Sequence, residues 1–415
     1  MNKTLTTVVV LATVISLLVS FFLSIAFVSA SAAEGTWTEM APMQEARGDL
    51  GVAVVNGKIY AIGGSTIQYF YQYGVLRNLT GEYVGTNEEY DPATDTWTYK
   101  SSMPTSRSGF AIAVYQNKIY CIGGYTNGPP SKTYLIGMTP NQTSANEVYD
   151  PSTDTWETMT PTPVPIAYSV ANTVEDKVYI TSSSSNGTIN VYDPTTDTWT
   201  TKTSNPMTAE ACCSTVLDNK LHYIQGASNP EDKFHQVYDP QTDSWSQKMP
   251  PPVITAYGVA AATTGVNAPK QIYILHFNYE SANAAAQGGT NYAASIATSV
   301  YTIANDTWTT GASPPTYRQG GYGVAIVDDC LYVIGGYTAA EDYFLVTDNL
   351  TQYATNEMYT PFGYRTPTSE TPPITATTNI VQSTVTTTLV IALAVSIAAV
   401  AICAVIYFKK RHRGS

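Results

Sequence analysis

Five of the six tryptophans of this 415-residue chain occupy the same place in a repeated phrase. The phrase has the form Tyr-Asp-Pro-x-Thr-Asp-Thr-Trp, with clear copies at residues 90–97, 149–156, 192–199 and 238–245 and a divergent one at 301–308. Self-similarity at a fixed register indicates a repeat architecture, and the repeat therefore decides the fold class.

The two ends of the repeat array complement each other. The tyrosines of the phrase fall at positions 90, 149, 192, 238, 301 and 359, so six units follow one another along the chain. The sixth copy, at 356–361, has no tryptophan after it, while Trp37 stands alone at the other end of the array. We expect the segment around Trp37 to form the outer strand of the last unit and to close a ring.

Each unit is predicted to contain four short strands. In the first unit, residues 51–55 are small and apolar, Asn56-Gly57 is a strong hairpin signal, and residues 58–62 form a second strand that Gly63-Gly64 ends. A third strand ends at Tyr90, and the turn at 91–95 leads into a fourth around Trp97. The segments 109–124 and 323–336 repeat the first half closely.

The double glycine, the Tyr-Asp-Pro turn and the spaced tryptophan resemble the kelch repeat, a propeller unit of about 50 residues. The resemblance covers roughly residues 35–361. It implies an all-β fold, a six-bladed kelch β-propeller over residues 34–365 that is closed by its N-terminal strand.

Membrane signals flank the predicted ring. Lys3, an apolar run at 8–28 and Ala30-Ser31-Ala32 predict a signal peptide over residues 1–32, with an uncleaved anchor as the alternative. Residues 389–408 are long and apolar enough for a transmembrane helix, and the basic tail at 409–415 follows at once. The positive-inside rule places that tail in the cytoplasm and the propeller outside the cell membrane, in a single-pass topology.

Residues 366–388, between ring and membrane, are rich in Thr, Ser and Pro. They are predicted to form an extended stalk or a plain linker.

The exposed part of the chain is strongly acidic. The formal net charge is −12, and Lys3 with the four cationic residues of the tail contributes five positive charges, so the remainder carries −17. This sign argues against nucleic acid and anionic lipid as partners. Phosphate loops, zinc spacings and nucleophile elbows are also missing, and we expect no cofactor.

The loops between second and third strands are unequal. They are long in units one (65–86), two (125–145), five (276–298) and six (337–355), which are consecutive around a ring, and short in units three and four. We expect the long loops to form a wall on one face. Their tyrosines suit protein or carbohydrate recognition, although about half are expected to pack on the propeller. The candidate ligand-binding tyrosines are Tyr71, Tyr125, Tyr279 and Tyr337.

Arg47, Arg107 and Arg318 stand before the innermost strands of units one, two and six, the same units that carry Asn-Glu at the start of the third strand. A structural Arg–Glu pair within each blade is one interpretation. The kelch resemblance implies the other, in which arginines at the mouth bind an acidic ligand.

The histidines are the residues on which a metal-dependent enzyme alternative would depend. His235 and His276 are expected near the mouth in adjacent units, and His276 joins the ligand-binding candidates, but a copper site like that of galactose oxidase would also need a cysteine there. A cofactor-free sugar mutarotase of the kelch type and a structural surface-layer component stay open as alternatives. The main hypothesis is an extracellular, membrane-anchored protein that binds a protein or glycan without catalysis.

Overall fold

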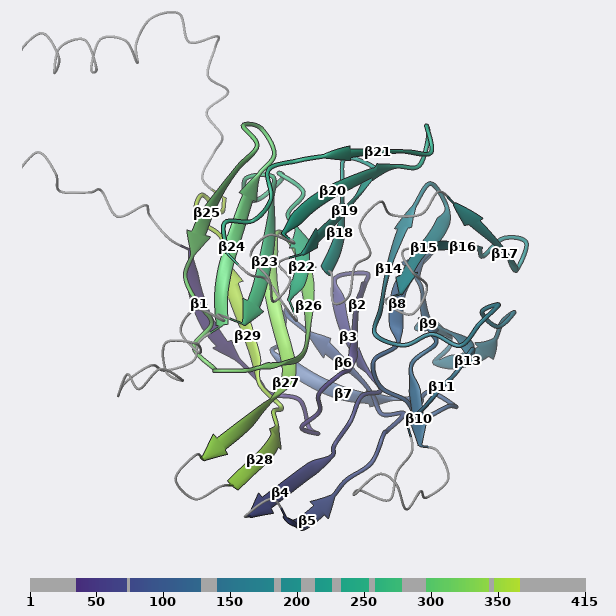
Figure 1. Cartoon of the computed structure of the whole chain (residues 1–415), viewed down its shortest axis with the longest axis vertical. Helices are drawn as coiled ribbons and strands as arrows, with labels where there is room; N and C mark the ends of the chain where they lie inside the picture. Colours follow the sequence, from purple (N-terminus) through teal and green to yellow (C-terminus); the bar gives the residue numbers. More distant parts are fainter. Residues whose placement is uncertain are drawn as a thin grey trace, which may run out of the picture. The chain divides into compact units, whose positions relative to one another are not determined.

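The computed structural model describes residues 35–72, 75–127, 140–182, 188–202, 213–225, 233–253, 258–277, 296–342 and 347–365. These residues lie in the compact unit Glu34–Thr366, which forms six antiparallel sheets of four principal strands arranged around a centre (Figure 1). The predicted signal peptide, stalk, transmembrane helix and tail lie outside the described residues. Within the described ranges, no helix is both long and apolar enough to cross a bilayer.

The first three blades have the same strand order from the centre outwards. Blade one consists of β2 (Gly51–Val55), β3 (Lys58–Ile62), β6 (Asn87–Asp91) and β7 (Thr96–Lys100). Blade two consists of β8 (Ala111–Tyr115), β9 (Lys118–Ile122), β12 (Asn146–Asp150) and β13 (Thr155–Thr158). Blade three consists of β14 (Ser169–Val174), β15 (Lys177–Ser182), β16 (Ile189–Asp193) and β17 (Thr198–Lys202).

The remaining blades follow the same order. Blade four consists of β18 (Cys213–Leu217), β19 (Lys220–Gln225), β20 (Phe234–Asp239) and β21 (Ser244–Gln247). Blade five consists of β22 (Val259–Ala262), β23 (Gln271–Phe277), β24 (Ile296–Thr302) and β25 (Thr307–Gly311). Blade six consists of β26 (Gly320–Val327), β27 (Cys330–Asp342), β29 (Asn356–Thr360) and β1 (Thr36–Met40).

The N-terminal strand closes the ring, as predicted. β1 pairs with β29 in antiparallel register, with Trp37 opposite Tyr359. Trp37 Nε1 donates a hydrogen bond to the Ala312 carbonyl of the preceding blade at 2.8 Å. The innermost strands contact one another in the cyclic order β2, β8, β14, β18, β22, β26 and back to β2. The chain therefore forms a closed six-bladed propeller.

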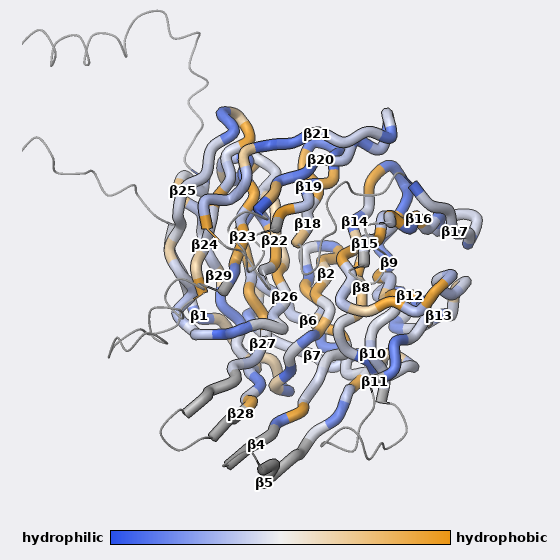
Figure 2. The backbone as a smooth tube through the Cα atoms, in the orientation of Figure 1, coloured by the Kyte–Doolittle hydropathy of each residue, from blue (hydrophilic) through white to orange (hydrophobic). Residues whose placement is uncertain are grey.

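Local sequence explains the inner hairpins. The side chains of β2 and β8 alternate between buried and partly buried positions, because both faces of an inner strand meet neighbouring blades. Asn56 and Gly57 have φ of 53° and 74°, the left-handed pair that a tight two-residue hairpin requires. Figure 2 shows hydrophobic stretches along these central strands.

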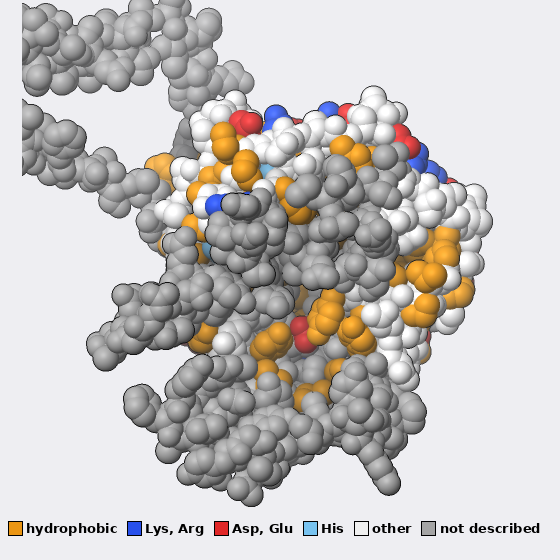
Figure 3. All heavy atoms as spheres, in the orientation of Figure 1, with side chains coloured by type: hydrophobic (Ala, Val, Ile, Leu, Met, Phe, Trp, Pro, Cys, Tyr) orange, Lys and Arg blue, Asp and Glu red, His pale blue; other side chains and the backbone are white. Residues whose placement is uncertain are grey.

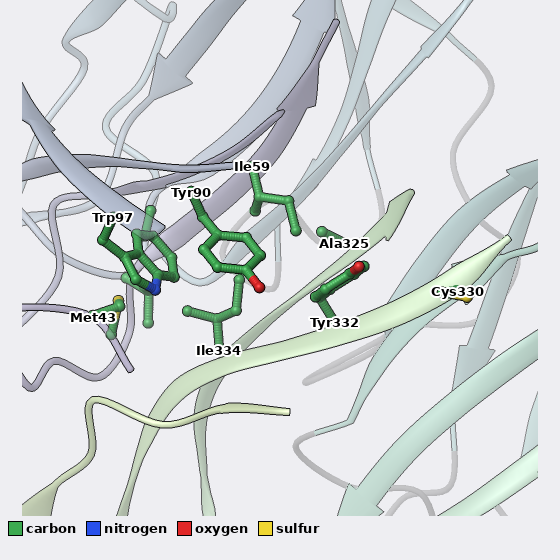
Figure 4. Close-up of a cluster of buried hydrophobic side chains, with 10 residues drawn as sticks. Met43, Ile59, Tyr90, Trp97, Ala325, Cys330, Tyr332 and Ile334 are labelled. Atoms are coloured by element: carbon green, nitrogen blue, oxygen red, sulfur yellow. The ribbon is translucent and has the colours of Figure 1, made fainter. Parts of the chain in front are cut away.

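Tyrosines fill the junctions between blades. Between blades six and one, the ring of Tyr90 lies 5.0 Å from that of Trp97 and 6.0 Å from that of Tyr332, in a cluster that also holds Ile59 and Ile334 (Figure 4). Second-strand and third-strand tyrosines meet in the same way at four other junctions, through the pairs 60–149, 120–192, 179–238 and 273–359. This recurring contact accounts for the fixed tyrosine of the phrase.

The rest of the phrase ties each blade to the one before it. In blade two, Asp154 Oδ1 accepts hydrogen bonds from the Tyr149 hydroxyl at 2.7 Å and from the Ser101 backbone N–H at 2.8 Å. Trp156 Nε1 donates to the Ser101 carbonyl at 2.8 Å. The same three bonds recur in blades one, three and five. We call this arrangement the blade latch.

A double glycine is predicted to end the second strand of a blade. Gly63-Gly64 follows the end of β3 as predicted, whereas β27 continues through Gly335-Gly336 to Asp342. The strand continues because its second half, from Tyr337, pairs with β28 (Thr347–Gln352) of the same long loop.

Candidate functional site

The long loops of blades six, one and two contain strands of their own. β28 pairs with β4 (Gln68–Gln72) of the blade-one loop, and β4 pairs with β5 (Val75–Thr80). The loops of blades six and one thus form one continuous sheet, seen at one end of the propeller in Figure 1. β10 (Tyr125–Asn127) and β11 (Pro140–Gln142) form a separate hairpin in blade two. The blade-five loop lies largely outside the described residues.

The three arginines lie below this face as structural residues. Arg47, Arg107 and Arg318 are fully buried, and each pairs with the glutamate of its own blade: Glu88 at 2.8 Å, Glu147 at 2.9 Å and Glu357 at 2.6 Å. Arg47 also donates to the Gly63 carbonyl at 2.6 Å. Burial lowers the pKa of Arg47, and the charge of Glu88 opposes that shift. The within-blade pair is therefore present, while ligand binding by the arginines stays a prediction.

A chain of backbone hydrogen bonds runs around the central mouth, from blade six to blade three. Asp49 N donates to the Gly321 carbonyl at 2.7 Å, Gly109 N to the Asp49 carbonyl at 2.9 Å, and Tyr168 N to the Gly109 carbonyl at 2.8 Å. All four residues are left-handed, with φ of 68° at Gly321, 53° at Asp49, 59° at Gly109 and 46° at Tyr168. We call these four residues the mouth rim.

Two rim positions require glycine and two carry side chains. A Cβ on Gly321 would lie 2.6 Å from the Tyr337 ring and 2.8 Å from Asp49 N, and one on Gly109 would lie 3.2 Å from the Tyr168 ring. Asp49 and Tyr168 adopt the same conformation, which is uncommon for a non-glycine residue and a clear outlier for a bulky one. The other described left-handed non-glycine residues, apart from Arg365, lie in the hairpin and Tyr-Asp-Pro turns.

The Asp49 carboxyl is the charged group of the mouth. Burial raises its pKa to about 6, and none of the described residues donates a side-chain hydrogen bond or ion pair to it. Its charge is the first cause of the raised pKa of Tyr168, ahead of burial. The pKa of Tyr83 is also raised, by burial and then by Asp49. Figure 3 shows an acidic side chain among hydrophobic ones in a hollow of this face.

Tyrosines lie at the mouth rim. The rings of Tyr125 and Tyr168 meet edge to face with centroids 5.3 Å apart. Tyr337 lies against Gly321, and a Cβ on Gly48 would be 2.9 Å from its ring. Tyr125 and Tyr337 are partly buried, whereas Tyr168 is 62 % exposed.

The other predicted site residues are placed as follows. The backbone of Tyr71 lies in β4, opposite Asp348 of β28. Tyr279 is outside the described residues. His276 is buried in β23, with Nε2 at 2.9 Å from Ser299 Oγ. Of the predicted tyrosines, the structure brings Tyr125 and Tyr337 to the mouth.

The expectation that His235 lies at the mouth beside His276 is wrong. His235 is fully buried, its Nε2 lies 2.9 Å from His222 Nδ1, and its ring meets Tyr301 edge to face at 4.6 Å. Burial is the main cause of the lowered pKa values, about 3 for His235 and about 4 for His222. The pair fills the junction of blades four and five, because His222 stands where β3, β9 and β15 carry tyrosine.

Sequence reasoning missed Asp49 and Tyr168. A signal was available, because Gly109 follows Arg107 by two residues, and the same offset from Arg47 reaches an aspartate. Clefts of 420 Å³ and 250 Å³ lie between blades one and two and between blades two and three, beside the hairpin turns of the opposite face. The 420 Å³ cleft is lined by Lys58, Glu89 and Asp150 among others, and these groups form ion pairs at or near it.

Comparisons with known proteins agree with the geometry. The kelch motif family matches residues 46–104 and 106–163. The kelch-like protein terF of Aspergillus terreus is 37 % identical over 161 residues, which is 38 % of this chain and 32 % of that protein. Beta-scruin of Limulus polyphemus is 27 % identical over 37 % of this chain and 15 % of its own length. The mouse influenza virus NS1A-binding protein homologue is 39 % identical over 21 % of this chain and 12 % of its length. The matches therefore span about a third or less of these relatives.

A solved structure extends the likeness in fold. The structure of YjhT superposes with a TM-score of 0.54, covering 76 % of this chain and 96 % of that one at 15 % sequence identity. At that identity the likeness concerns the fold alone.

Proposed function

Because this chain is a kelch-repeat β-propeller protein, we propose that it is a membrane-anchored binding protein of the cell surface. Its propeller recognises an extracellular protein or glycan with the face that carries the long loops and the mouth rim. Kelch propellers are typical protein-binding scaffolds. One curated relative is named for binding a protein, the influenza virus NS1A protein.

The observation that carries the proposal is the pairing of β28 with β4. Long loops on a compact fold are usually functional or disordered. Here the loops of blades six and one order each other through backbone hydrogen bonds and extend beyond the ring, beside the open mouth. Partly buried tyrosines stand between the loops and the mouth, and tyrosine provides stiff contact area with a polar tip.

The surface location rests on the sequence. The apolar segments at 8–28 and 389–408, with the basic tail after the second, support export of the propeller and a single membrane-spanning helix. An epitope tag placed after Ser415 tests this topology. We expect antibody access to that tag only after cells are permeabilised, while an antibody against the propeller stains intact cells. The reverse pattern would contradict the proposed orientation.

Binding is tested with the ring, residues 34–365, on glycan arrays and against extracellular proteins of the source cells. We expect specific ligands whose affinity falls at least tenfold in Tyr337→Ala and Tyr125→Ala. Tyr99→Ala is the matched control, because Tyr99 is 54 % exposed on the outer strand β7. Ligands that none of the mouth substitutions weakens would move the binding site away from this face.

A further inference from the structure

We propose that the mouth of the propeller is a receptor site for a basic side chain, in which the Asp49 carboxylate and the surrounding tyrosine rings hold the ammonium of a lysine or the guanidinium of an arginine supplied by a protein partner. The inference rests on the proposed binding function and names the chemistry of its central contact.

The position of Asp49 is the first support. The mouth rim repeats one left-handed backbone conformation at four blades, and glycine takes it at 109 and 321 at no steric cost. Asp49 takes it with a side chain that bears charge, in the centre of the loop-bearing face. Strained residues of this kind cluster at ligand sites, where the surrounding structure over-determines them. The propeller could be built with glycine at this position, so the carboxylate is not required by the ring.

The state of the carboxylate is the second support. Most other carboxylates near this face have partners: Glu88, Glu147 and Glu357 pair with the arginines below the mouth. Asp49 receives no side-chain hydrogen bond or ion pair from any residue in the described ranges. Asp49 is partly buried, and a ligand cation would offset the cost of removing its carboxylate in part from water without a partner.

The walls of the site are the third support. Tyr83 and Tyr168 feel the charge of the carboxyl, Tyr125 packs on Tyr168, and Tyr337 lies against Gly321 of the mouth rim. These four tyrosines come from the loops of blades one, two and six and from the start of blade three. Aromatic faces attract organic cations through the ring quadrupole, with greater strength when the site is desolvated. A metal ion such as Ca²⁺ would need six to eight oxygen ligands, which one carboxylate does not provide.

The net negative charge of the chain favours a basic protein surface as the source of the cation. Outside the basic tail and Lys3, the chain carries −17. A field of that sign attracts a basic partner surface and raises its rate of association. A lysine or arginine at the tip of a partner loop combines that surface with a side chain long enough to enter the mouth.

The test uses the full-length chain in detergent and two probes, N-acetyl-lysine amide and N-acetyl-arginine amide, with N-acetyl-norleucine amide as the neutral match. Saturation-transfer NMR and calorimetry measure binding at pH 7.5. We expect at least one basic probe to bind at least tenfold more tightly than the norleucine probe, and Asp49→Asn and Asp49→Gly each to abolish that preference. Asp176→Asn is the control, since Asp176 is another left-handed aspartate but is exposed in a hairpin turn of the opposite face.

Three results would overturn the inference. One is equal binding of basic and neutral probes. The second is a preference for basic probes that survives in both Asp49 variants, each checked by thermal unfolding. The third is binding of Ca²⁺ without response to either amide. Failure of the proposed function gives a different result. If both Asp49 variants bind a macromolecular ligand at full affinity, the proposed binding function stands and the site for a basic side chain is rejected. If the basic probes bind but no macromolecular ligand is found, the site stands and the proposed binding function is not supported.

Discussion

At the residue scale, the mouth rim holds a partly buried carboxylate that has no side-chain partner among the described residues. The buried arginines place their charge beside a glutamate of the same blade. Asp49 instead combines an unfavourable backbone conformation with partial burial of an acid. Both features reduce stability, and this is why we assign Asp49 to binding rather than to the scaffold.

The Asp49 pKa gives a pH-dependent prediction. The folded-state pKa of Asp49, about 6, lies above the unfolded value near 3.8. The contribution of this carboxyl to the free energy of unfolding is therefore most favourable below about pH 4, where it is neutral, and is lost as the pH rises through 6. Asn resembles the neutral acid. We expect Asp49→Asn to match the wild type in free energy of unfolding at pH 4, and to exceed it by on the order of 1–2 kcal/mol at pH 7.5.

Urea titrations of both proteins from pH 4 to 8 measure this difference. The titratable groups coupled to the Asp49 charge are Tyr83 and Tyr168, and the pKa of each is raised, so both stay neutral across that range. A constant difference between the two proteins at all pH values would contradict the raised pKa.

The buried ion pairs give a second prediction. Glu88→Gln would leave the Arg47 charge buried without its carboxylate, and we expect a loss of about 3 kcal/mol in the free energy of unfolding. The exposed Glu82→Gln is the control, with a change under about 0.5 kcal/mol. Full stability of Glu88→Gln together with lost ligand binding would instead assign Arg47 and Glu88 to the ligand site.

At the scale of elements, the blade latch explains why one set of three side chains recurs. The aspartate and the tryptophan of one blade bind the backbone N–H and C=O of one residue in the preceding blade, and the tyrosine donates to the aspartate. The aspartate accepts its hydrogen bonds from a left-handed position in the turn, with φ of 54° at Asp154. Each latch joins the turn before an outer strand to the preceding blade.

Substitutions in one latch separate its parts. Asp154→Gly keeps the left-handed turn and removes the acceptor of two donors, and we expect it to cost about 2 kcal/mol. Trp156→Phe removes one hydrogen bond and part of the ring, at a cost of about 1 kcal/mol. Chemical denaturation measures both, and Thr153→Ala on the exposed side of the turn is the control. Equal stability of Asp154→Gly and the control would show that the latch is not a source of stability.

At the scale of the whole molecule, stability depends on closure. The two ends of the ring are 324 residues apart in the chain between Gly35 and Tyr359, and Gly35 N donates to the Tyr359 hydroxyl at 3.2 Å. Without β1, β29 would become an unpaired edge strand. Blade six therefore depends on a segment that enters from the opposite end of the sequence.

Trp37→Ala tests closure. The substitution removes the hydrogen bond to Ala312 and the ring contact with Tyr359 at 5.1 Å, and we expect a loss of about 3 kcal/mol and a lower Tm. Tyr99→Ala removes a comparable ring from an exposed site and should change stability by less than about 0.5 kcal/mol. If the two variants unfold alike, closure by β1 contributes little to stability.

The sequence alone determined the number of blades, the strands of each blade and the closing strand. These follow from local signals, since Asn56-Gly57 sets a hairpin and the Tyr–Trp spacing sets the outer pair. It also predicted the within-blade pairing of Arg47 with Glu88, because both residues start strands on one face. Periodicity and turn chemistry act over a few residues, and the six units of the repeat each carry these local signals.

Only the tertiary structure decided what the mouth contains. The pairing of β28 with β4 joins residues that lie 275 to 281 positions apart in the chain, and no local pattern specifies which loop edges meet. The left-handed backbone of Asp49 and Tyr168 arises because neighbouring blades share hydrogen bonds at the rim. His235 joined His222 rather than His276 because the junction of blades four and five lacked the usual tyrosine and needed another ring to fill it. Each of these outcomes depends on the approach of blades that the ring, once closed, holds in contact.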